Sequence, residues 1–484
     1  MANPGISSYG VYIPSRRLER SAIAAAHAWA MPSLRGLAKG QRSFCNWDED
    51  SITMAVDASR GCLRGHSVNP DTLVFASTTP PYSDLQNAGV VAGAMQMEKV
   101  STLDVGGSLR AGLSALIQAF RSTNEHSGET LVVAADHRKA KPASVQEMQY
   151  GAGAAALSVC ADGGIARFLG SASSSKQFVD HFRASGEEFD YYWEERWVRD
   201  EGYLKIVPPV IRRLLDEHGV SAEDVRHFCL PGTLRGVDAA VAKKSGIAAE
   251  AVVDNLAMQV GDTGAPHALI QLAAALERAQ AGDLILVAGF GSGCEALLLQ
   301  ATEKLADYRS AAPLSTALHH GIADSHYLRL LSASGQIELD WGMRSETDGK
   351  TALTQFYRAS DQVAGLVGGE CGECGTVQFP RLATCVNCGS MEPMSKAPLA
   401  DEPARVKTFT ADWLQYYPSP PLYFGLVQFD NGARILMEIV DVDAEKLAVG
   451  LPLRMVFRIK EKDERRHYNR YFWKATPLIS DQDS

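Results

Sequence analysis

Two related stretches of the sequence constrain the fold more than any other feature. The first, LDVGGSLRAGLSAL at 103–116, has the pattern of a strand end, a Gly-Gly turn and a buried helix. The second, QVGDTGAPHALI at 259–270, again places a glycine turn before an apolar helix. The run Ala-Leu-Ile-Gln occurs in both stretches, at 115–118 and 268–271. We interpret the pair as an internal duplication of one supersecondary unit.

The shared run places Leu109 opposite Asp262 in the two copies. Each helix then leads through a Gly-acidic turn into a strand, at 129–135 and at 283–289. A helix that begins after a glycine turn directs unpaired backbone N–H groups toward whatever lies before it. The duplication therefore predicts one pocket at which two helix N-termini meet.

The rest of the chain up to residue 302 has strands that alternate with helices. Strands are expected at 71–78, 154–159 and 284–287, and helices at 205–217 and 235–245. This alternation predicts an α/β fold with a largely buried sheet. A chain of 484 residues, with 46% hydrophobic and 21% charged residues, can build more than one such core.

Charge and hydropathy limit the classes of partner. The net charge of −10 disfavours nucleic acid as the main partner. The N-terminus MANPGISSYG has no secretion-signal pattern, and no apolar run reaches the ~20 residues that span a bilayer. We therefore predict a cytoplasmic protein that binds neither nucleic acid nor membrane.

Two segments interrupt the α/β pattern. The segment 177–205 is dense in aromatic and charged residues, and it either covers a substrate entrance or packs on its own aromatics. The turn GFGSG at 289–293 resembles a phosphate-binding loop only superficially, since no Lys-Ser/Thr follows it and a strand comes next. A backbone turn that lines a pocket is the better interpretation.

Four of the nine cysteines form two CxxC pairs with ten residues between them. This spacing is typical of a tetrahedral Zn²⁺ site, in which each turn presents two thiolates to one ion. All four positions would be protein ligands, so the zinc would be structural rather than catalytic. The predicted ligands are Cys371, Cys374, Cys385 and Cys388.

The C-terminal segment 404–477 contains alternating strands with a turn signal, Asp-Asn-Gly, at 430–432. A small antiparallel barrel is expected. The run RRHYNRY at 465–471 mixes basic and aromatic residues, which suits single-stranded nucleic acid, a nucleotide-like cofactor or an exposed strand. The acidic net charge makes nucleic acid the least favoured of the three.

Several of these motifs match known families. The stretches GISSYGVYIP at 5–14, DEDSITMA at 48–55, AADHRKAKP at 134–142 and YGAGAAA at 150–156 resemble the thiolase superfamily. The resemblance is to its hydroxymethylglutaryl-CoA synthase-like and ketoacyl synthase III-like members, and it covers roughly 4–302. The remainder, from about 355 to 478, resembles the zinc-ribbon plus OB-fold proteins found beside thiolase-like enzymes.

The resemblance implies a duplicated thiolase fold with αβαβα layers, then a rubredoxin-like zinc ribbon and a small β-barrel of the OB-fold type. It also implies a homodimer through the thiolase-like domain and an acyl-CoA substrate, so coenzyme A enters as part of the substrate. The expected domains are a thiolase-like domain at 1–305, with halves of about 1–170 and 205–305, a helical connector at 306–360, the zinc ribbon at 361–395 and the OB-fold domain at 396–484.

The chain departs from the family at its catalytic positions. The positions of the family's Cys, His and Asn fall on Leu109, Gly232 and Asp262, and that of its Glu lies near Thr78. A leucine cannot attack a thioester, so a covalent acyl-enzyme is disfavoured. Ser108 has no evident base beside it, and Cys294 is expected to be a packed, inert thiol.

Other groups can still polarise a thioester and move protons. Backbone N–H groups near Ser108 and Leu109, and near Gly291 and Gly293, are candidates for an oxyanion hole. The candidate proton carriers are Asp262, His267, Tyr150 and Asp136. Asp262 is expected to have a raised pKa in an apolar pocket, unless it caps a helix. For His267, Tyr150 and Asp136 the alternatives are core packing and structural hydrogen bonds.

Three functions are compatible with these residues. The first is aldol-type cleavage of a β-hydroxyacyl-CoA, which needs no covalent intermediate; thiolase-like proteins that pair with the zinc-ribbon/OB subunit include sterol side-chain aldolases. The second is thiolysis or acyl transfer on a β-keto substrate, with direct attack by the CoA thiol. The third is a non-catalytic acyl-CoA-binding subunit of a thiolase complex.

Overall fold

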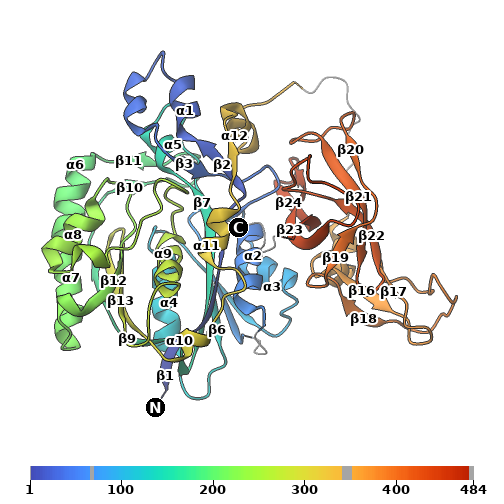
Figure 1. Cartoon of the computed structure of the whole chain (residues 1–484), viewed down its shortest axis with the longest axis horizontal. Helices are drawn as coiled ribbons and strands as arrows, with labels where there is room; N and C mark the ends of the chain where they lie inside the picture. Colours follow the sequence, from blue (N-terminus) through green and yellow to red (C-terminus); the bar gives the residue numbers. More distant parts are fainter. Residues whose placement is uncertain (1, 66–69, 341–351, 479–484) are drawn as a thin grey trace. The chain divides into compact units, whose positions relative to one another are not determined.

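The computed structural model describes residues 2–65, 70–340 and 352–478, which group into two compact units (Figure 1). Unit 1 comprises Met1–Cys45, Asp50–Gly89 and Lys99–Leu330. Unit 2 comprises Asn46–Glu49, Val90–Glu98 and Leu331–Ser484.

Unit 1 is built on one ten-stranded sheet. Its strand order is β12-β13-β14-β9-β1-β7-β6-β4-β5, with β8 (Asp162–Gly164) paired beside β1. The bounds are β1 Asn3–Tyr12, β4 Thr72–Ala76, β5 Ser101–Val105, β6 Thr130–His137, β7 Ala152–Cys160, β9 Ala166–Ser175, β12 Val225–Cys229, β13 Leu284–Phe290 and β14 Gly293–Ala301.

The sheet consists of two halves with the same connectivity, which confirms the predicted duplication. In the first half, helix α4 (Ala111–Ser122) leads to β6, which lies parallel to β4 and antiparallel to β7. In the second half, α9 (His267–Leu276) leads to β13, which lies parallel to β12 and antiparallel to β14. The halves join where β1 and β9 pair antiparallel.

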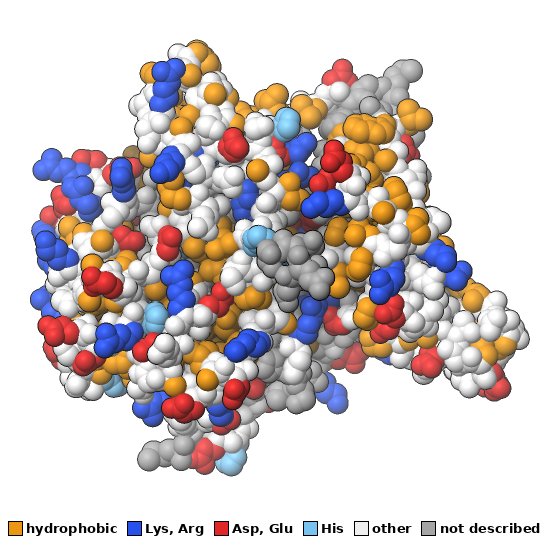
Figure 2. Space-filling model, viewed as in Figure 1, with side chains coloured by type: hydrophobic (Ala, Val, Ile, Leu, Met, Phe, Trp, Pro, Cys, Tyr) orange, Lys and Arg blue, Asp and Glu red, His pale blue; other side chains and the backbone are white. Residues whose placement is uncertain are grey.

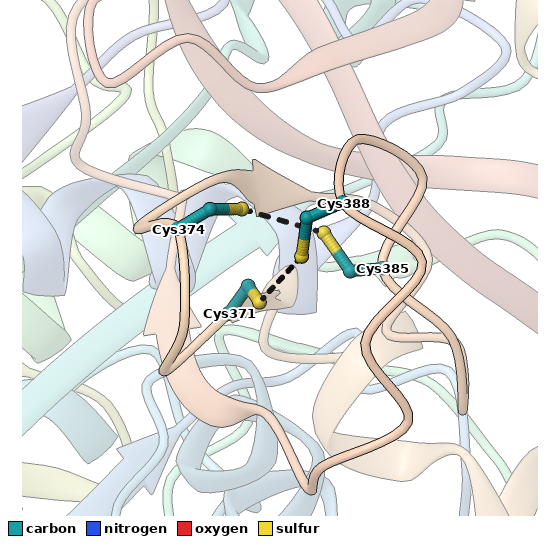
Figure 3. A group of neighbouring side chains, drawn as sticks. All are labelled: Cys371, Cys374, Cys385 and Cys388. Carbon is teal, nitrogen blue, oxygen red and sulfur yellow. Dashed lines mark hydrogen bonds between the residues drawn. The ribbon is translucent and has the colours of Figure 1, made fainter.

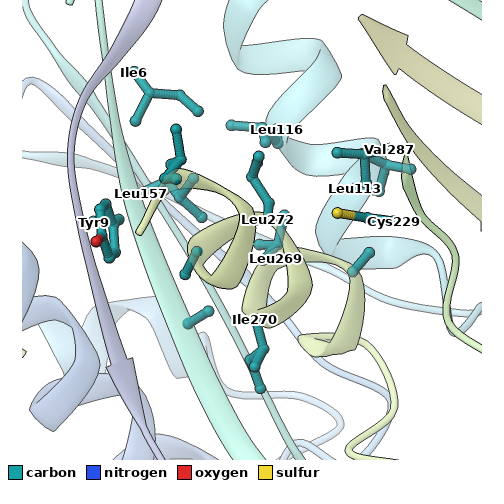
Figure 4. Packing of buried hydrophobic residues seen from close by; sticks show 14 of the residues in the cluster. Ile6, Tyr9, Leu113, Leu116, Leu157, Cys229, Leu269, Ile270, Leu272 and Val287 are labelled. Atoms are coloured by element: carbon teal, nitrogen blue, oxygen red, sulfur yellow. The ribbon is translucent and has the colours of Figure 1, made fainter. Parts of the chain in front are cut away.

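Helices α4 and α9 form the centre of the core (Figure 4). Every residue of α9 is buried, because its sequence HALIQLAAAL is apolar on nearly all sides. A helix of this composition is stable in water only between two other layers. Leu113 and Leu116 of α4 share one buried cluster with Leu269 and Leu272 of α9.

Two further helices cover the outer faces of the sheet halves. Helix α2 (Ser51–Leu63) packs on β1, β6 and β7, and α7 (Leu204–Glu217) packs on β9, β13 and β14. Helix α2 begins at a capping box, in which Asp50 accepts a hydrogen bond from the Thr53 N–H at 2.9 Å and the Thr53 hydroxyl oxygen accepts one from the Asp50 N–H at 2.8 Å. These layers are those of the thiolase fold, as predicted.

Part of the expected connector 306–360 belongs to unit 1. Helix α11 (Leu314–His319) packs on β1 and α9, and strand β15 (Ile322–Asp324) pairs in parallel with β2 (Arg16–Glu19). Unit 1 therefore continues to Leu330. These elements are too short for a periodic hydrophobic pattern, so composition alone did not assign them to the domain.

Unit 2 contains two small sheets. The first has three strands in the order β17-β16-β18, namely Val377–Gln378, Val367–Glu370 and Ser395–Pro398. The second has six strands, all antiparallel in their pairings, and an isolated bridge joins Ile439 to Ala475. Its strands are β19 Ala404–Val406, β20 Thr410–Asp412, β21 Leu422–Phe429, β22 Arg434–Glu438, β23 Pro452–Asp463 and β24 Tyr468–Pro477.

The basic and aromatic run 465–471 forms the turn and first residues of the β23–β24 hairpin. Arg466 pairs with Asp463 at 2.6 Å, and Arg470 pairs with Glu461. Tyr471 is buried and stacks on Phe457. Of the four basic residues in the run 465–471, Arg466 and Arg470 therefore form ion pairs within the hairpin.

Figure 2 shows Lys and Arg side chains interspersed with Asp and Glu over the viewed face of α7 and α8 (Val237–Ser245). The described residues include no helix that is both long and apolar enough to cross a membrane.

Candidate functional site

A pocket in unit 1 brings the two duplicated turns together. The pocket is partly open to solvent. Leu109 and Asp262, which the duplication aligns, both line it. The other lining residues are Gln146, Gln149, Asp180, Tyr192, Trp193, Glu195, Val198, Tyr203, Thr233 and Leu234.

The backbone fixes Asp262 beside Tyr150. The Asp262 N–H donates to the Gln149 carbonyl at 2.8 Å, and the Gly151 N–H donates to the Asp262 carbonyl at 2.8 Å. The preceding Gly261 has φ +87°, and a Cβ there would lie 2.7 Å from the Gln149 oxygen. Only glycine allows this approach, so the turn holds the carboxylate at one position.

The Asp262 side chain is ionised by its neighbours. Arg138 Nη2 donates to Oδ2 at 2.7 Å, and the Gly264 N–H donates to Oδ1 at 2.9 Å. Burial is the largest single influence and raises the pKa of Asp262. The charge of Arg138, the nearby His267 and the hydrogen bonds from Gly264 and Arg138 together outweigh it, so the pKa lies below its ordinary value. The expected raised pKa is therefore wrong, because it assumed a pocket without a cation.

Arg138 is the main site residue that sequence reasoning missed. Its side chain is 1% exposed, lies 3.7 Å from Asp190 Oδ2 and stacks 3.9 Å from the ring centroid of Tyr150. Arg183 contacts the other oxygen of Asp190 at 2.7 Å. Two arginines and two aspartates thus form one paired cluster. An arginine directly after a buried strand end, in AADHRKAKP, was the available signal.

Tyr150 belongs to this cluster rather than to the pocket lining. Its Oη donates to Asp190 Oδ2 at 2.6 Å, and its side chain is fully buried. Burial raises the pKa of Tyr150 far above the ordinary value. The phenol therefore keeps its proton and orients Asp190.

Asp136 is a saturated structural carboxylate. It is completely buried and accepts hydrogen bonds from Ser77, from Thr78 and Thr79, and from the Ala265 N–H at 2.8 Å. These bonds tie the end of β4 to the start of α9, and Asp136 is not among the pocket-lining residues.

His267 is a satisfied core residue in this structure. Its Nδ1 accepts from the Thr263 N–H at 3.1 Å, and its Nε2 lies 2.9 Å from the Asn255 carbonyl, to which it donates. This arrangement requires the neutral tautomer with the proton on Nε2. Burial lowers the pKa of His267, and the ring does not line the pocket.

His267 makes a specific contribution to acid lability. Because its folded-state pKa lies below the unfolded value of about 6.5, the unfolded chain binds the extra proton first. Stability is therefore fully present above pH 6.5 and falls as the pH drops below it. We expect His267→Gln to flatten the decrease in melting temperature between pH 6.5 and 5, measured by calorimetry. An unchanged slope would contradict the assignment of a buried neutral imidazole.

The turn 289–293 abuts the turn before α4. Ser108 Oγ lies 3.4 Å from the Gly291 carbonyl oxygen. A Cβ on Gly291 would lie only 2.6 Å from the Ser108 Oγ. The Gly291 N–H donates to the Gly293 carbonyl at 3.0 Å, so it is used within the turn. The Leu109 N–H has no acceptor within the described part of the chain. Of the residues predicted to form the oxyanion hole, Leu109 alone is among the pocket-lining residues of the described chain.

The two alternative nucleophiles lack activation. The Ser108 hydroxyl contacts the Arg110 N–H at 3.3 Å and the Gly291 carbonyl, neither of which is a base. Cys294 is fully buried on β14, and burial raises the pKa of its thiol to about 12. Neither residue is among those that line the pocket.

The segment 177–205 packs on its own aromatics, as one of the two interpretations predicted, and it also borders the pocket. Strands β10 (His181–Phe182) and β11 (Tyr191–Tyr192) form a hairpin, and the Tyr192 ring stacks on His181 at 5.4 Å. Tyr192 and Trp193 also line the pocket. The segment is therefore a self-packed wall of the pocket.

The four cysteines of unit 2 converge on one point (Figure 3). The Sγ atoms of Cys371 and Cys388 are 3.7 Å apart, as are those of Cys374 and Cys385. A tetrahedral zinc site with Zn–S bonds of ~2.3 Å has sulfur–sulfur edges of about 3.8 Å. The geometry fits Zn²⁺ with four protein ligands, and it is the one candidate metal cluster in the described residues.

Family models match three parts of the chain. Residues 215–300 match the C-terminal part of 3-oxoacyl-[acyl-carrier-protein] synthase III. Residues 365–392 match the rubredoxin-like zinc ribbon domain of ChsH2, and 398–458 match its C-terminal OB-fold domain. The chain is thus a fusion of a part similar to 3-oxoacyl-[acyl-carrier-protein] synthase III with a zinc ribbon and an OB-fold domain.

Hydroxymethylglutaryl-CoA synthases are similar to most of this chain. The hydroxymethylglutaryl-CoA synthase of Aeropyrum pernix is 28% identical over 366 residues, which cover 73% of this chain and 97% of that protein. The hydroxymethylglutaryl-CoA synthase of Methanopyrus kandleri is 28% identical over 319 residues, or 64% and 91% of the two chains.

Solved structures share the fold of about two thirds of this chain. One is MvaS in complex with 3-hydroxy-3-methylglutaryl coenzyme A, at 19% identity and TM-score 0.58, covering 68% of this chain and 92% of that one. Another is 3-oxoacyl-(acyl carrier protein) synthase III of Pseudomonas aeruginosa PAO1, at 21% identity and TM-score 0.56, covering 62% and 98%.

Proposed function

We propose that the fusion cleaves a β-hydroxyacyl-CoA by an aldol-type reaction, without a covalent acyl-enzyme. The hydroxymethylglutaryl-CoA synthase relatives favour a CoA thioester, and MvaS is similar in fold and was solved with a β-hydroxyacyl-CoA. Coenzyme A would be part of the substrate, and the zinc would stabilise the ribbon.

One observation carries the proposal: a hydrocarbon and a carboxylate face the same pocket from the two duplicated turns. Leu109 offers no nucleophile, and no cysteine, serine or histidine is among the lining residues of the described chain. Asp262 is the one lining group there that combines an ionised carboxylate with a buried cationic partner. The arrangement suits proton transfer rather than acyl transfer to the enzyme.

The reaction balances with these groups. The Asp262 carboxylate accepts the proton of the substrate β-hydroxyl, the carbon–carbon bond between Cα and Cβ breaks, and a carbonyl compound leaves. The electron pair of that bond passes into the thioester as an enolate, whose oxygen would accept a hydrogen bond from the Leu109 N–H. Protonation of the enolate carbon from solvent then gives the shorter acyl-CoA, and Asp262 releases the hydroxyl proton to solvent, which restores the carboxylate.

Arg138 sets the strength of the base. Its charge keeps Asp262 ionised at neutral pH, although a lowered pKa makes the carboxylate a weaker proton acceptor. Arg138 is not itself among the lining residues of the described chain, and it acts by positioning Asp262.

We expect Asp262→Asn to lower kcat/KM for β-hydroxyacyl-CoA cleavage by about 10²–10⁴-fold, which is the usual size of a general-base contribution. The amide keeps an oxygen for Arg138, so the fold is retained. The measurement is the release of carbonyl product and acyl-CoA across a panel of β-hydroxyacyl-CoAs. Asp162→Asn, at an exposed position of β8 in the same unit, is the matched control. Full activity of the Asp262 variant would remove the proposed base.

Product analysis separates the remaining functions. Thiolysis of a β-keto substrate gives two acyl products, whereas aldol cleavage gives one acyl-CoA and one ketone or aldehyde. Binding of CoA esters with no turnover would select a non-catalytic subunit. An acyl adduct on any side chain, seen by intact-protein mass spectrometry, would contradict the non-covalent mechanism.

The homodimer stays a prediction of the resemblance. Strand β5 lies at one end of the ten-stranded sheet, and its Leu103 is 53% exposed. Light scattering of the purified protein would establish the state of association.

A further inference from the structure

The charges of the pocket lining all have one sign. The lining carboxylates are Asp180, Glu195 and Asp262, and no lysine, arginine or histidine side chain is among the lining residues of the described chain. The other walls are mostly aliphatic or aromatic: Leu109, Val198, Leu234, Tyr192, Trp193 and Tyr203.

The cations behind the lining are already paired. Arg138 contacts Asp262 at 2.7 Å, and Arg183 contacts Asp190 at 2.7 Å. These two arginines balance these two aspartates. His181 also lies nearby, and its Nδ1 is 2.8 Å from Asp180. The charge of each arginine is therefore offset by an aspartate, and neither arginine is among the lining residues of the described chain.

This charge distribution discriminates between acyl groups. An acyl group with a second carboxylate would lose water and meet Asp180 and Glu195, for which the described lining residues include no lysine or arginine as a compensating cation, and this is unfavourable. An uncharged acyl group loses little hydration and gains contact with the aliphatic and aromatic walls.

We propose that the pocket accepts an uncharged, apolar acyl group and rejects an acyl group that carries a second carboxylate. The inference rests on the proposed function in one respect, namely that a CoA thioester places its acyl group in this pocket. The hydroxymethylglutaryl group bound to MvaS carries such a carboxylate, so the fusion differs from that structural neighbour in the acyl group it selects.

The test uses two CoA thioethers that cannot be cleaved, S-hexyl-CoA and S-(5-carboxypentyl)-CoA. They share the CoA part, so its phosphates contribute equally to both affinities. We expect the full-length, zinc-containing protein to bind the neutral thioether at least about tenfold more tightly by isothermal titration calorimetry at pH 7.5.

Charge-removing variants locate the source of the preference. Asp180→Asn combined with Glu195→Gln is expected to narrow the ratio of the two dissociation constants at least about threefold, since two of the three carboxylates become neutral. Glu195→Gln alone changes an exposed side chain, and it is expected to narrow the ratio in the same direction if the double variant does not fold. Glu187→Gln, exposed in the same segment and outside the lining, is the control and should leave the ratio unchanged.

Equal or tighter binding of the carboxylated thioether would overturn the inference, as would an unchanged ratio in Glu195→Gln. Failure of both thioethers to bind would overturn it together with the proposed function. A preserved preference without cleavage of any β-hydroxyacyl-CoA would refute only the proposed reaction.

Discussion

Cys385→Ser is expected to abolish zinc binding and unfold the three-stranded ribbon of unit 2. Cys385 is buried and supplies one of four converging thiolates. The strands of this ribbon are only two to four residues long, so they bury too little apolar surface to fold unaided. Metal binding contributes roughly 10–16 kcal/mol in comparable small zinc sites, and that energy is folding energy.

Zinc content and local structure are the two measurements. The wild-type protein should hold one zinc per chain by elemental analysis, and the variant none. The Trp473 indole N–H donates to the Ala364 carbonyl at 2.6 Å, just before the ribbon, so tryptophan fluorescence should also change. Cys45→Ser, outside the cluster, is the control and should keep its zinc. A Cys385→Ser protein with full zinc and resistance to protease would disprove the structural site.

Arg138→Met is expected to destabilise unit 1 by about 3–5 kcal/mol, the usual cost of removing one partner from a buried ion pair. The variant leaves the Asp262 carboxylate, 11% exposed, without its cation. Asp190 keeps Arg183, so most of the loss should come from Asp262. The measurement is chemical denaturation followed by circular dichroism.

The pH dependence gives this prediction its specific signature. In the wild-type protein the lowered pKa of Asp262 contributes stability above the unfolded value of about 3.9, and this is lost as the pH falls through the folded value. Without Arg138, burial raises the pKa and the ionised form becomes unfavourable. The loss of unfolding free energy caused by Arg138→Met should therefore be largest near pH 8 and should decrease toward pH 5.

Two further variants test whether the loss of stability comes from the unpaired charge of Asp262. Asp262→Asn in the Arg138→Met background should recover part of the loss, because it removes the unpaired charge. Lys304→Met breaks an exposed ion pair with Asp162 and should cost at most about 1 kcal/mol. A loss from Arg138→Met as small as that of Lys304→Met, and independent of pH, would show that the buried pair is not what stabilises this turn.

The sequence predicted those features that depend on local pattern or on repetition. The helices at 111–122 and 267–276 and the strands after them carry their own periodicity, and the two CxxC pairs fix a metal geometry by spacing alone. The shared run Ala-Leu-Ile-Gln predicted that Leu109 and Asp262 lie at one pocket, and both line it.

Contacts between distant segments could not be predicted in the same way. Arg138, Asp190 and Asp262 come from three separated segments, so the cation that reverses the pKa shift of Asp262 has no local signature. The hydrogen bond from His267 to the Asn255 carbonyl likewise depends on a loop path. Composition predicted that the aromatic segment near 190 would pack, but not which of its side chains would reach the pocket.

The mutual burial of α4 and α9 affects how the chain is made. On the ribosome, α4 emerges more than a hundred residues before α9, and until then the apolar face that α9 later covers stays open to water. The nascent first half is therefore exposed to aggregation and to chaperones for the time needed to translate the second. Synonymous codons that slow elongation between the two helices would lengthen that interval and lower the yield of native protein.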